Sequence, residues 1–151
     1  MNTTRRQVIK TAGALSTLVS LGIITQAQAL AAETRPGFEA KSYADAIGAL
    51  GAKPADSGDI QVVTPDIAEN GAVVPVGAVS NIPNTTDIWF LVEKNPFPMA
   101  AGFSIPAGTK ADVQTRLKMG QTSNVTVVVK ADGKLYAASK ETKVTLGGCG
   151  G

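Results

Sequence analysis

Short runs of alternating apolar and polar residues occupy the chain from Asp59 onward. Between Val113 and Met119 the odd-numbered positions are apolar or threonine and the even-numbered positions are polar, as in a strand with one buried and one solvated face. Proline, glycine and asparagine separate runs of this kind at regular intervals. Seven strands are predicted: Ile60–Thr64, Val73–Asn81, Asp87–Glu93, Met99–Ile105, Asp112–Lys118, Asn124–Lys130 and Lys134–Leu146, the last with an interruption left open.

Seven short strands within about 90 residues predict an all-β fold, an immunoglobulin-like antiparallel β-sandwich over residues 58–146. The Asp132-Gly133 pair predicts a tight hairpin between the last two strands. Trp89 is expected in the sandwich core, with a surface anchor for a partner as the alternative. Phe97 lies between two prolines on a loop, where it either anchors a partner or folds back under that loop.

A helical pattern precedes the strands. Residues 30–57 are predicted to form a linker and an N-terminal helix, because apolar residues recur near helical spacing within Phe38–Leu50. Gly51 is a suitable C-terminal cap, and Pro54 prevents the helix from continuing. We expect this short helix to pack on its own domain rather than dock a partner.

Residues 1–29 have the pattern of an export signal. Arg5 and Arg6 form a twin-arginine motif, and an apolar stretch follows over residues 12–25. Small residues then allow cleavage after residue 29 or after residue 31. The apolar stretch is too short to span a bilayer comfortably, which disfavours a transmembrane helix. We therefore expect a periplasmic protein exported by the twin-arginine route.

Removal of this signal changes the charge balance. Three of the 14 basic residues lie in it, so 11 basic residues remain against 12 acidic ones and the mature protein has a formal charge of −1. No basic patch remains to indicate a nucleic acid or an anionic membrane as a partner. The charge balance therefore favours neither class of partner.

The residue inventory excludes most catalytic and metal chemistry. The chain has no histidine and one cysteine, which excludes c-type haem attachment, blue-copper ligation, four-cysteine metal sites and histidine-dependent nucleophilic catalysis. No cofactor, no metal and no enzymatic activity are expected. A loose acidic cluster lacks the fixed spacing of a calcium loop, so a solvated face is favoured over weak calcium binding. Its members are Asp56, Asp59, Asp66 and Glu69.

The single cysteine, Cys149, stands between two glycine pairs at the C-terminus. Glycine has no side chain to bury and loses much backbone entropy on ordering, so this segment is not expected in a core. We predict an arm of residues 147–151, in which Cys149 is the reactive residue and the glycines give flexibility and access. No cation is close in sequence, and the terminal carboxylate holds the pKa of the Cys149 thiol at or slightly above its usual value. Such a thiol suits covalent attachment better than catalysis. The glycines concerned are Gly147, Gly148, Gly150 and Gly151.

The order of these features resembles one known family. The ending Val144-Thr145-Leu146 followed by Gly-Gly-Cys-Gly-Gly, behind a twin-arginine signal and a small β-sandwich, is similar to the SoxY family of the bacterial sulfur-oxidation (Sox) system. The resemblance implies a sulfur carrier for thiosulfate oxidation, with intermediates held covalently on Cys149 as an S-thiosulfonate and then a persulfide. It also implies a heterodimer with SoxZ, a small β-sandwich subunit that is exported alongside.

The same resemblance implies three visiting enzymes: a c-type cytochrome that couples thiosulfate to the cysteine, a hydrolase that releases sulfate, and a sulfur dehydrogenase. An alternative remains, in which the chain is a structural subunit and Cys149 forms an interchain disulfide. A thiol enzyme ranks last, because the chain offers neither an activated nor a resolving cysteine.

Overall fold

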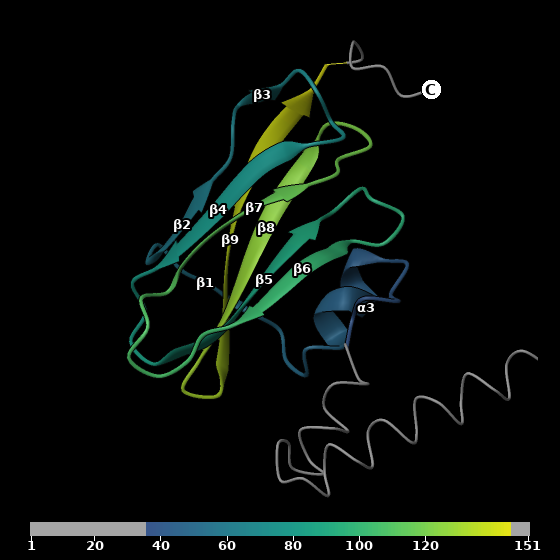
Figure 1. The fold of residues 1–151 in the computed structure, drawn as a ribbon. Coiled ribbons are helices and arrows are strands. Elements are labelled where there is room, and N and C mark those ends of the chain that lie inside the picture. The colour runs from purple at the N-terminus through teal and green to yellow at the C-terminus, as the bar shows by residue number, and fades with distance from the viewer. Residues whose placement is uncertain (1–35, 146–151) are drawn as a thin grey trace, which may run out of the picture. The chain divides into compact units, whose positions relative to one another are not determined.

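The computed structural model describes residues 36–145 (Figure 1). The predicted signal peptide with Arg5 and Arg6, and the predicted arm with Cys149, lie outside the described residues. No helix among residues 36–145 is long and apolar enough to cross a membrane.

Nine strands and one helix, α3 (Tyr43–Gly48), make up the described part of the chain. The larger sheet has the order β1-β9-β8-β5-β6, with β3 also pairing with β9, and the smaller sheet has the order β2-β4-β7. The strands are β1 (Ala55–Asp56), β2 (Ile60–Val63), β3 (Ile67–Ala68), β4 (Val74–Ser80), β5 (Thr85–Val92), β6 (Met99–Ser104), β7 (Asp112–Leu117), β8 (Ser123–Ala131) and β9 (Lys134–Val144).

The main core lies between the two sheets. Strand β8 supplies Val125, Val127 and Val129 to this core, because alternate residues of a strand face the same side. Phe90 of β5 is fully buried there and packs edge-on against Phe103, with 6.0 Å between ring centroids. The order β2-β4-β7 against β9-β8-β5 is that of an immunoglobulin-like domain, which confirms the predicted all-β sandwich.

The predicted hairpin between the last two strands is confirmed. Asp132 and Gly133 both have positive φ values, 49° and 73°, which suit a tight turn between right-twisted strands. The Asp132 carboxylate also accepts a hydrogen bond from Asn84 Nδ2 at 3.0 Å. Strand β9 then continues unbroken to Val144, so the interruption that the sequence left open does not occur.

The N-terminal helix is much shorter than predicted. It begins at Tyr43 rather than Phe38, because the Ser42 side chain caps it by accepting a hydrogen bond from the Asp45 amide. Residues 36–39 form a turn instead, in which Gly37 has a φ of 88°. Phe38 still packs with the helix on the outer face of the larger sheet, so the expectation that the helix packs on its own domain is confirmed.

Trp89 does not fill the sandwich core, and this prediction was wrong. Its neighbours in β5, Ile88 and Phe90, face the core, so the alternation of the strand turns Trp89 to the outer face of the larger sheet. There it packs in a second cluster with α3 and lies against Gly102, where a side chain would clash with the indole ring. Trp89 therefore belongs to the layer between the helix and the sheet.

Candidate functional site

The predicted site residues Cys149, Gly147, Gly148, Gly150 and Gly151 lie outside the described residues, so the structure defines the site from its base. The last described residue is Thr145, which directly follows β9. Strand β9 is held along nine residue pairs with β8, from Lys134 to Thr142. We call residues 143–145 the arm base, because the predicted arm follows from them.

Strand β3 holds the arm base on one edge. This two-residue strand pairs in parallel with β9 alone, placing Ile67 beside Lys143 and Ala68 beside Val144. The Lys143 amide donates to the Asp66 carbonyl at 3.0 Å, and the Thr145 amide donates to the Ala68 carbonyl at 3.1 Å. The backbone is thus fixed as far as Thr145.

A side chain holds the arm base on its other edge. Register pairs between β8 and β9 end at Ser123 and Thr142. One residue farther along, the Val144 amide donates to the Thr122 hydroxyl at 3.0 Å. Thr122 therefore replaces the backbone acceptor that β8 no longer provides at this point.

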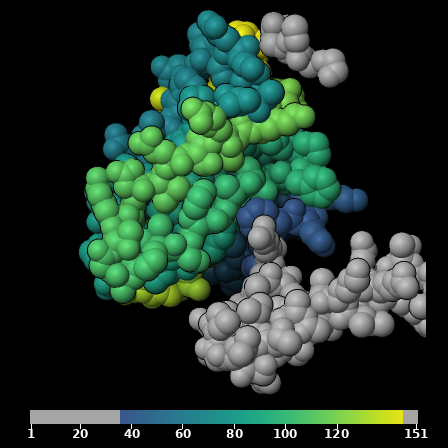
Figure 2. Space-filling model, viewed as in Figure 1, coloured from purple at the N-terminus to yellow at the C-terminus, as the bar shows by residue number. Residues whose placement is uncertain are grey.

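Close packing beneath the arm base requires glycine at position 71. The Gly71 carbonyl accepts a hydrogen bond from the Met119 amide at 2.6 Å. A Cβ atom at Gly71 would lie 2.8 Å from Val144 Cγ1 and closer still to the Met119 carbonyl oxygen. Figure 2 shows the β3–β4 segment against the β7–β8 loop at this end of the sandwich. Gly71 lets these two segments meet under Val144.

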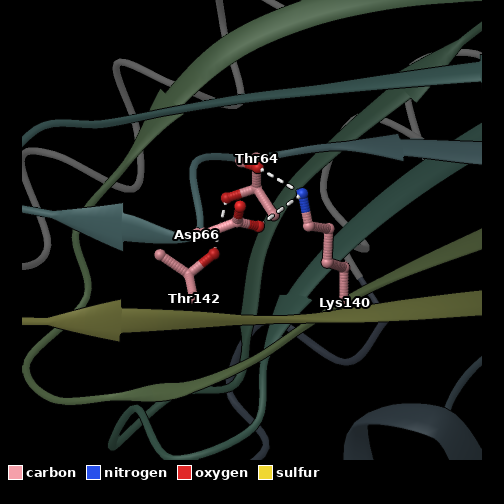
Figure 3. Close-up of polar contacts among 4 residues, drawn as sticks. All are labelled: Thr64, Asp66, Lys140 and Thr142. Atoms are coloured by element: carbon pink, nitrogen blue, oxygen red, sulfur yellow. Dashed lines mark hydrogen bonds and ion pairs between the residues drawn. The ribbon is translucent and has the colours of Figure 1, made fainter.

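A polar cluster ties the chain before β3 to β9 (Figure 3). The Lys140 ammonium donates to the Thr64 carbonyl at 2.9 Å and forms a 3.0 Å ion pair with the Asp66 carboxylate. The hydroxyls of Thr64 and Thr142 share a buried hydrogen bond of 2.6 Å. Because Asp66 directly precedes β3, these contacts position the strand that holds the arm base.

Replacing Thr142 with valine should remove one partner of the buried hydroxyl pair and leave the Thr64 hydroxyl unsatisfied. We expect a loss of about 1–3 kcal/mol in the free energy of unfolding, measured by chemical denaturation. The double variant Thr64→Val/Thr142→Val should recover most of this loss, because no unpaired hydroxyl then remains. Equal losses that simply add in the double variant would contradict the coupling.

Residues 36–145 contain no group of three or more acidic, cysteine or histidine side chains that could hold a metal ion. Asp56 and Asp66 of the acidic cluster lie beside opposite ends of β9, since β1 pairs at Tyr136–Ala137 and β3 at Lys143–Val144. A surface hollow of about 550 Å³ on the β2-β4-β7 sheet has Arg116 as its one titratable lining residue.

The arm was predicted from the sequence, but the contacts that hold the arm base were not. Strands β1 and β3 have two residues each, too few to show an alternating pattern. Thr122 is one hydroxyl residue in a polar loop, and its contact to Val144 spans 22 positions. The Asn70-Gly71 pair is a local turn signal, but the close approach at Gly71 depends on residues far away in the sequence.

The fold and site together define a small β-sandwich protein whose strand β9 is held on both edges up to the last described residue. The model of the family "Sulfur oxidation protein SoxY" matches residues 46–149. The chain belongs to the SoxY family of sulfur oxidation proteins. The match reaches Cys149, and family membership supports a carrier role in sulfur oxidation together with other proteins of the Sox pathway.

A solved structure agrees with this assignment. The sulfur carrier protein SoxY from Chlorobium limicola f thiosulfatophilum is 42% identical, with a TM-score of 0.60, over 66% of this chain and 92% of that one. Two distant matches are a chain from a structure of T cell activation by toxic shock syndrome toxin-1 and the human F-spondin reeler domain. The first is 10% identical with a TM-score of 0.41, over 57% of this chain and 99% of that one. The second is 11% identical with a TM-score of 0.43, over 64% and 96%. Comparison with curated protein sequences gave no significant match.

Proposed function

We propose that this protein is a periplasmic sulfur carrier that holds intermediates of thiosulfate oxidation covalently on Cys149. The observation that carries the proposal is the anchored arm base, which fixes the backbone up to Thr145, four residues before the only cysteine of the chain. A carrier needs a fixed attachment point and one accessible thiol. The family match, which includes Cys149, supports the same role.

The loading step forms one bond at the cysteine. The Cys149 sulfur bonds to the outer sulfur of thiosulfate and one proton leaves the thiol. Two electrons leave one at a time, and each reduces an Fe(III) haem of a c-type cytochrome to Fe(II). The product is a cysteine S-thiosulfonate. A hydrolase then uses one water molecule to cleave the bond to the sulfonate sulfur, which releases sulfate and two protons and leaves a cysteine persulfide. A sulfur dehydrogenase can oxidise the remaining sulfur while it stays attached.

In this proposal the partner enzymes, and not the carrier, catalyse the reactions at the Cys149 sulfur. Glycines flank Cys149 on both sides, so only bare backbone must enter an enzyme's cleft with the thiol. The twin-arginine motif at Arg5 and Arg6 supports export to the periplasm, together with a SoxZ-like β-sandwich subunit. The carrier itself then needs no cofactor.

Loading should be visible by mass spectrometry. After incubation with thiosulfate and the cytochrome of the same bacterium, we expect intact protein heavier by one thiosulfate less a proton, with the added mass on the C-terminal peptide. The added mass should disappear on treatment with a reductant, because it is held by a sulfur–sulfur bond. Unmodified Cys149 after turnover would contradict the proposal.

The interchain disulfide remains a second candidate, because a lone terminal cysteine in an oxidising compartment can pair between chains. It predicts obligate dimers on non-reducing gels. A dimer can also be an idle form of the carrier, so the mass measurement and not the gel distinguishes the two functions.

A further inference from the structure

Three large apolar side chains are exposed around the end of the sandwich from which the predicted arm leaves. The exposed fractions are 58% for Ile67, 51% for Val73 and 51% for Phe97, and we call these three residues the arm-end trio. Among residues 36–145, the one other large hydrophobic side chain exposed to this degree is Val63, at 49%. Val63 lies on the outer face of β2, because its neighbour Val62 faces the core.

Pairing and hydrogen bonds join the segments that contain the trio to the end of the sandwich where the arm base lies. Ile67 lies in β3, opposite Lys143. Val73 follows Gly71, which contacts Val144 and bonds to the Met119 amide. The Phe97 loop joins the same region, because Asn95 Nδ2 donates to the Lys118 carbonyl at 2.7 Å and Asn95 Oδ1 accepts from the Gly120 amide at 3.3 Å.

Phe97 stands on a rigid loop. Prolines flank it on both sides, and Pro98 is fully buried while its carbonyl accepts a 2.8 Å hydrogen bond from the Val92 amide. The bonds of Asn95 fix the other end of the loop. A fixed aromatic side chain loses little conformational entropy on binding, and aromatic residues are enriched in protein interfaces. Phe97 is 51% exposed, so of the two sequence-based alternatives, folding back under its loop is wrong.

The length of the chain beyond Thr145 decides what meets this surface. Cys149 is the fourth residue after Thr145, and an extended chain advances at most about 3.6 Å per residue, so their Cα atoms stay within about 14 Å. Small-molecule sites of enzymes are recessed in clefts. An enzyme that acts on the Cys149 sulfur must therefore bring the rim of its cleft against the surface around Thr145.

We propose that the arm-end trio is the docking surface for the enzymes that act on Cys149, with Phe97 as the main anchor. This inference rests on the proposed carrier function. The matching surface on the enzyme is an apolar rim around the entrance to its active site. A shared surface of this kind would let several enzymes accept one arm.

The charges near the trio are balanced, so apolar contact rather than electrostatic attraction holds the enzyme. Four basic and four acidic residues lie in residues 66–73, 93–98, 118–123 and 140–145. They are Lys94, Lys118, Lys140, Lys143, Asp66, Glu69, Glu93 and Glu141. Docking should therefore depend only weakly on ionic strength.

The test compares Phe97→Ser and Ile67→Ser with the matched control Val63→Ser, each in the full exported chain with its co-purified subunit. Initial rates of thiosulfate loading by the cytochrome are measured against carrier concentration. We expect the KM for the carrier to rise about tenfold in Phe97→Ser, with the maximum rate unchanged and the KM of the control close to that of the unmodified chain. Alkylation of Cys149 by iodoacetamide should be equally fast in all variants, because the thiol itself is unaltered.

The outcomes separate the two proposals. Failure of the cytochrome to load the unmodified chain overturns the carrier function and the docking surface with it. Normal loading of the unmodified chain, with no change of KM in either trio variant, overturns the docking surface alone. Loss of the co-purified subunit, or a change in the number of copies, in Phe97→Ser assigns the trio to a subunit interface or to self-association and also overturns it.

Discussion

Replacing Cys149 with serine is expected to abolish thiosulfate-dependent sulfate production in cells that carry this chain as their only copy. Serine keeps the size and polarity of the side chain but cannot form a sulfur–sulfur bond. No other cysteine exists to take over, because the chain has only one. Sulfate release is the measurement, with thiosulfate as the sole electron donor.

Two controls accompany this variant. The temperature of unfolding should match that of the unmodified protein, because the glycine-rich segment around Cys149 is not expected in the core. Co-purification of the partner subunit should also persist, since the proposed role of the thiol lies in turnover. Normal sulfate production, or loss of assembly in place of turnover, would favour the structural alternative with an interchain disulfide.

Gly71→Ala is expected to destabilise the protein and to disturb the arm base. The added methyl group would lie closer than 3.0 Å to both the Met119 carbonyl oxygen and Val144 Cγ1. Relief of this overlap must separate the β3–β4 segment from the β7–β8 loop or displace Val144. We expect a loss of about 1–3 kcal/mol in the free energy of unfolding. Faster hydrogen exchange should appear at the amides of Val144 and Thr145, which lose their held geometry.

Gly120→Ala is the matched control, because nothing lies within 4 Å of the position that its Cβ would occupy. Gly120 is one residue from Met119 and is exposed, so the two variants alter the same end of the sandwich. The control should leave both the free energy of unfolding and the exchange of the arm-base amides nearly unchanged. Equal effects of the two substitutions would show that the close approach at Gly71 does not matter.

The strands were predictable where the chain alternates over five or more residues. Each of the seven predicted strands occurs, with no end shifted by more than two residues, because alternation reports directly which side chains face a core. The two-residue strands β1 and β3 were missed, and both pair in parallel with β9, more than 70 positions away. Local patterns contain no information on such pairing.

The errors on Trp89 and on the N-terminal helix have a different cause. Trp89 was assigned to the main core because it is the only tryptophan of a small sandwich, whereas the alternation of its neighbours Ile88 and Phe90 indicates the opposite face. The helix was extended to Phe38 by apolar spacing, although Ser42 with Asp45 three residues later is a capping pattern. In both cases a local rule in the sequence was available and was given too little weight.

The candidate site was predictable from the sequence only in part. Cys149 and its glycines follow from the sequence, because composition and position alone make this segment unusual. The arm base required three-dimensional structure, since it assembles β3, Thr122 and Gly71 around Val144 from separate parts of the chain. The docking surface also required it, because exposure of Phe97 cannot be read from a loop sequence.

The parallel pairing of β3 with the end of β9 has a mechanical consequence. A force applied to the chain beyond Thr145 along the axis of β9 acts perpendicular to the hydrogen bonds that join β9 to β3 and β8. Such a force loads these hydrogen bonds in shear, so they resist it together and do not break one after another. Under the proposed carrier function, this geometry would let strand β9 resist detachment when a partner draws on the chain beyond Thr145.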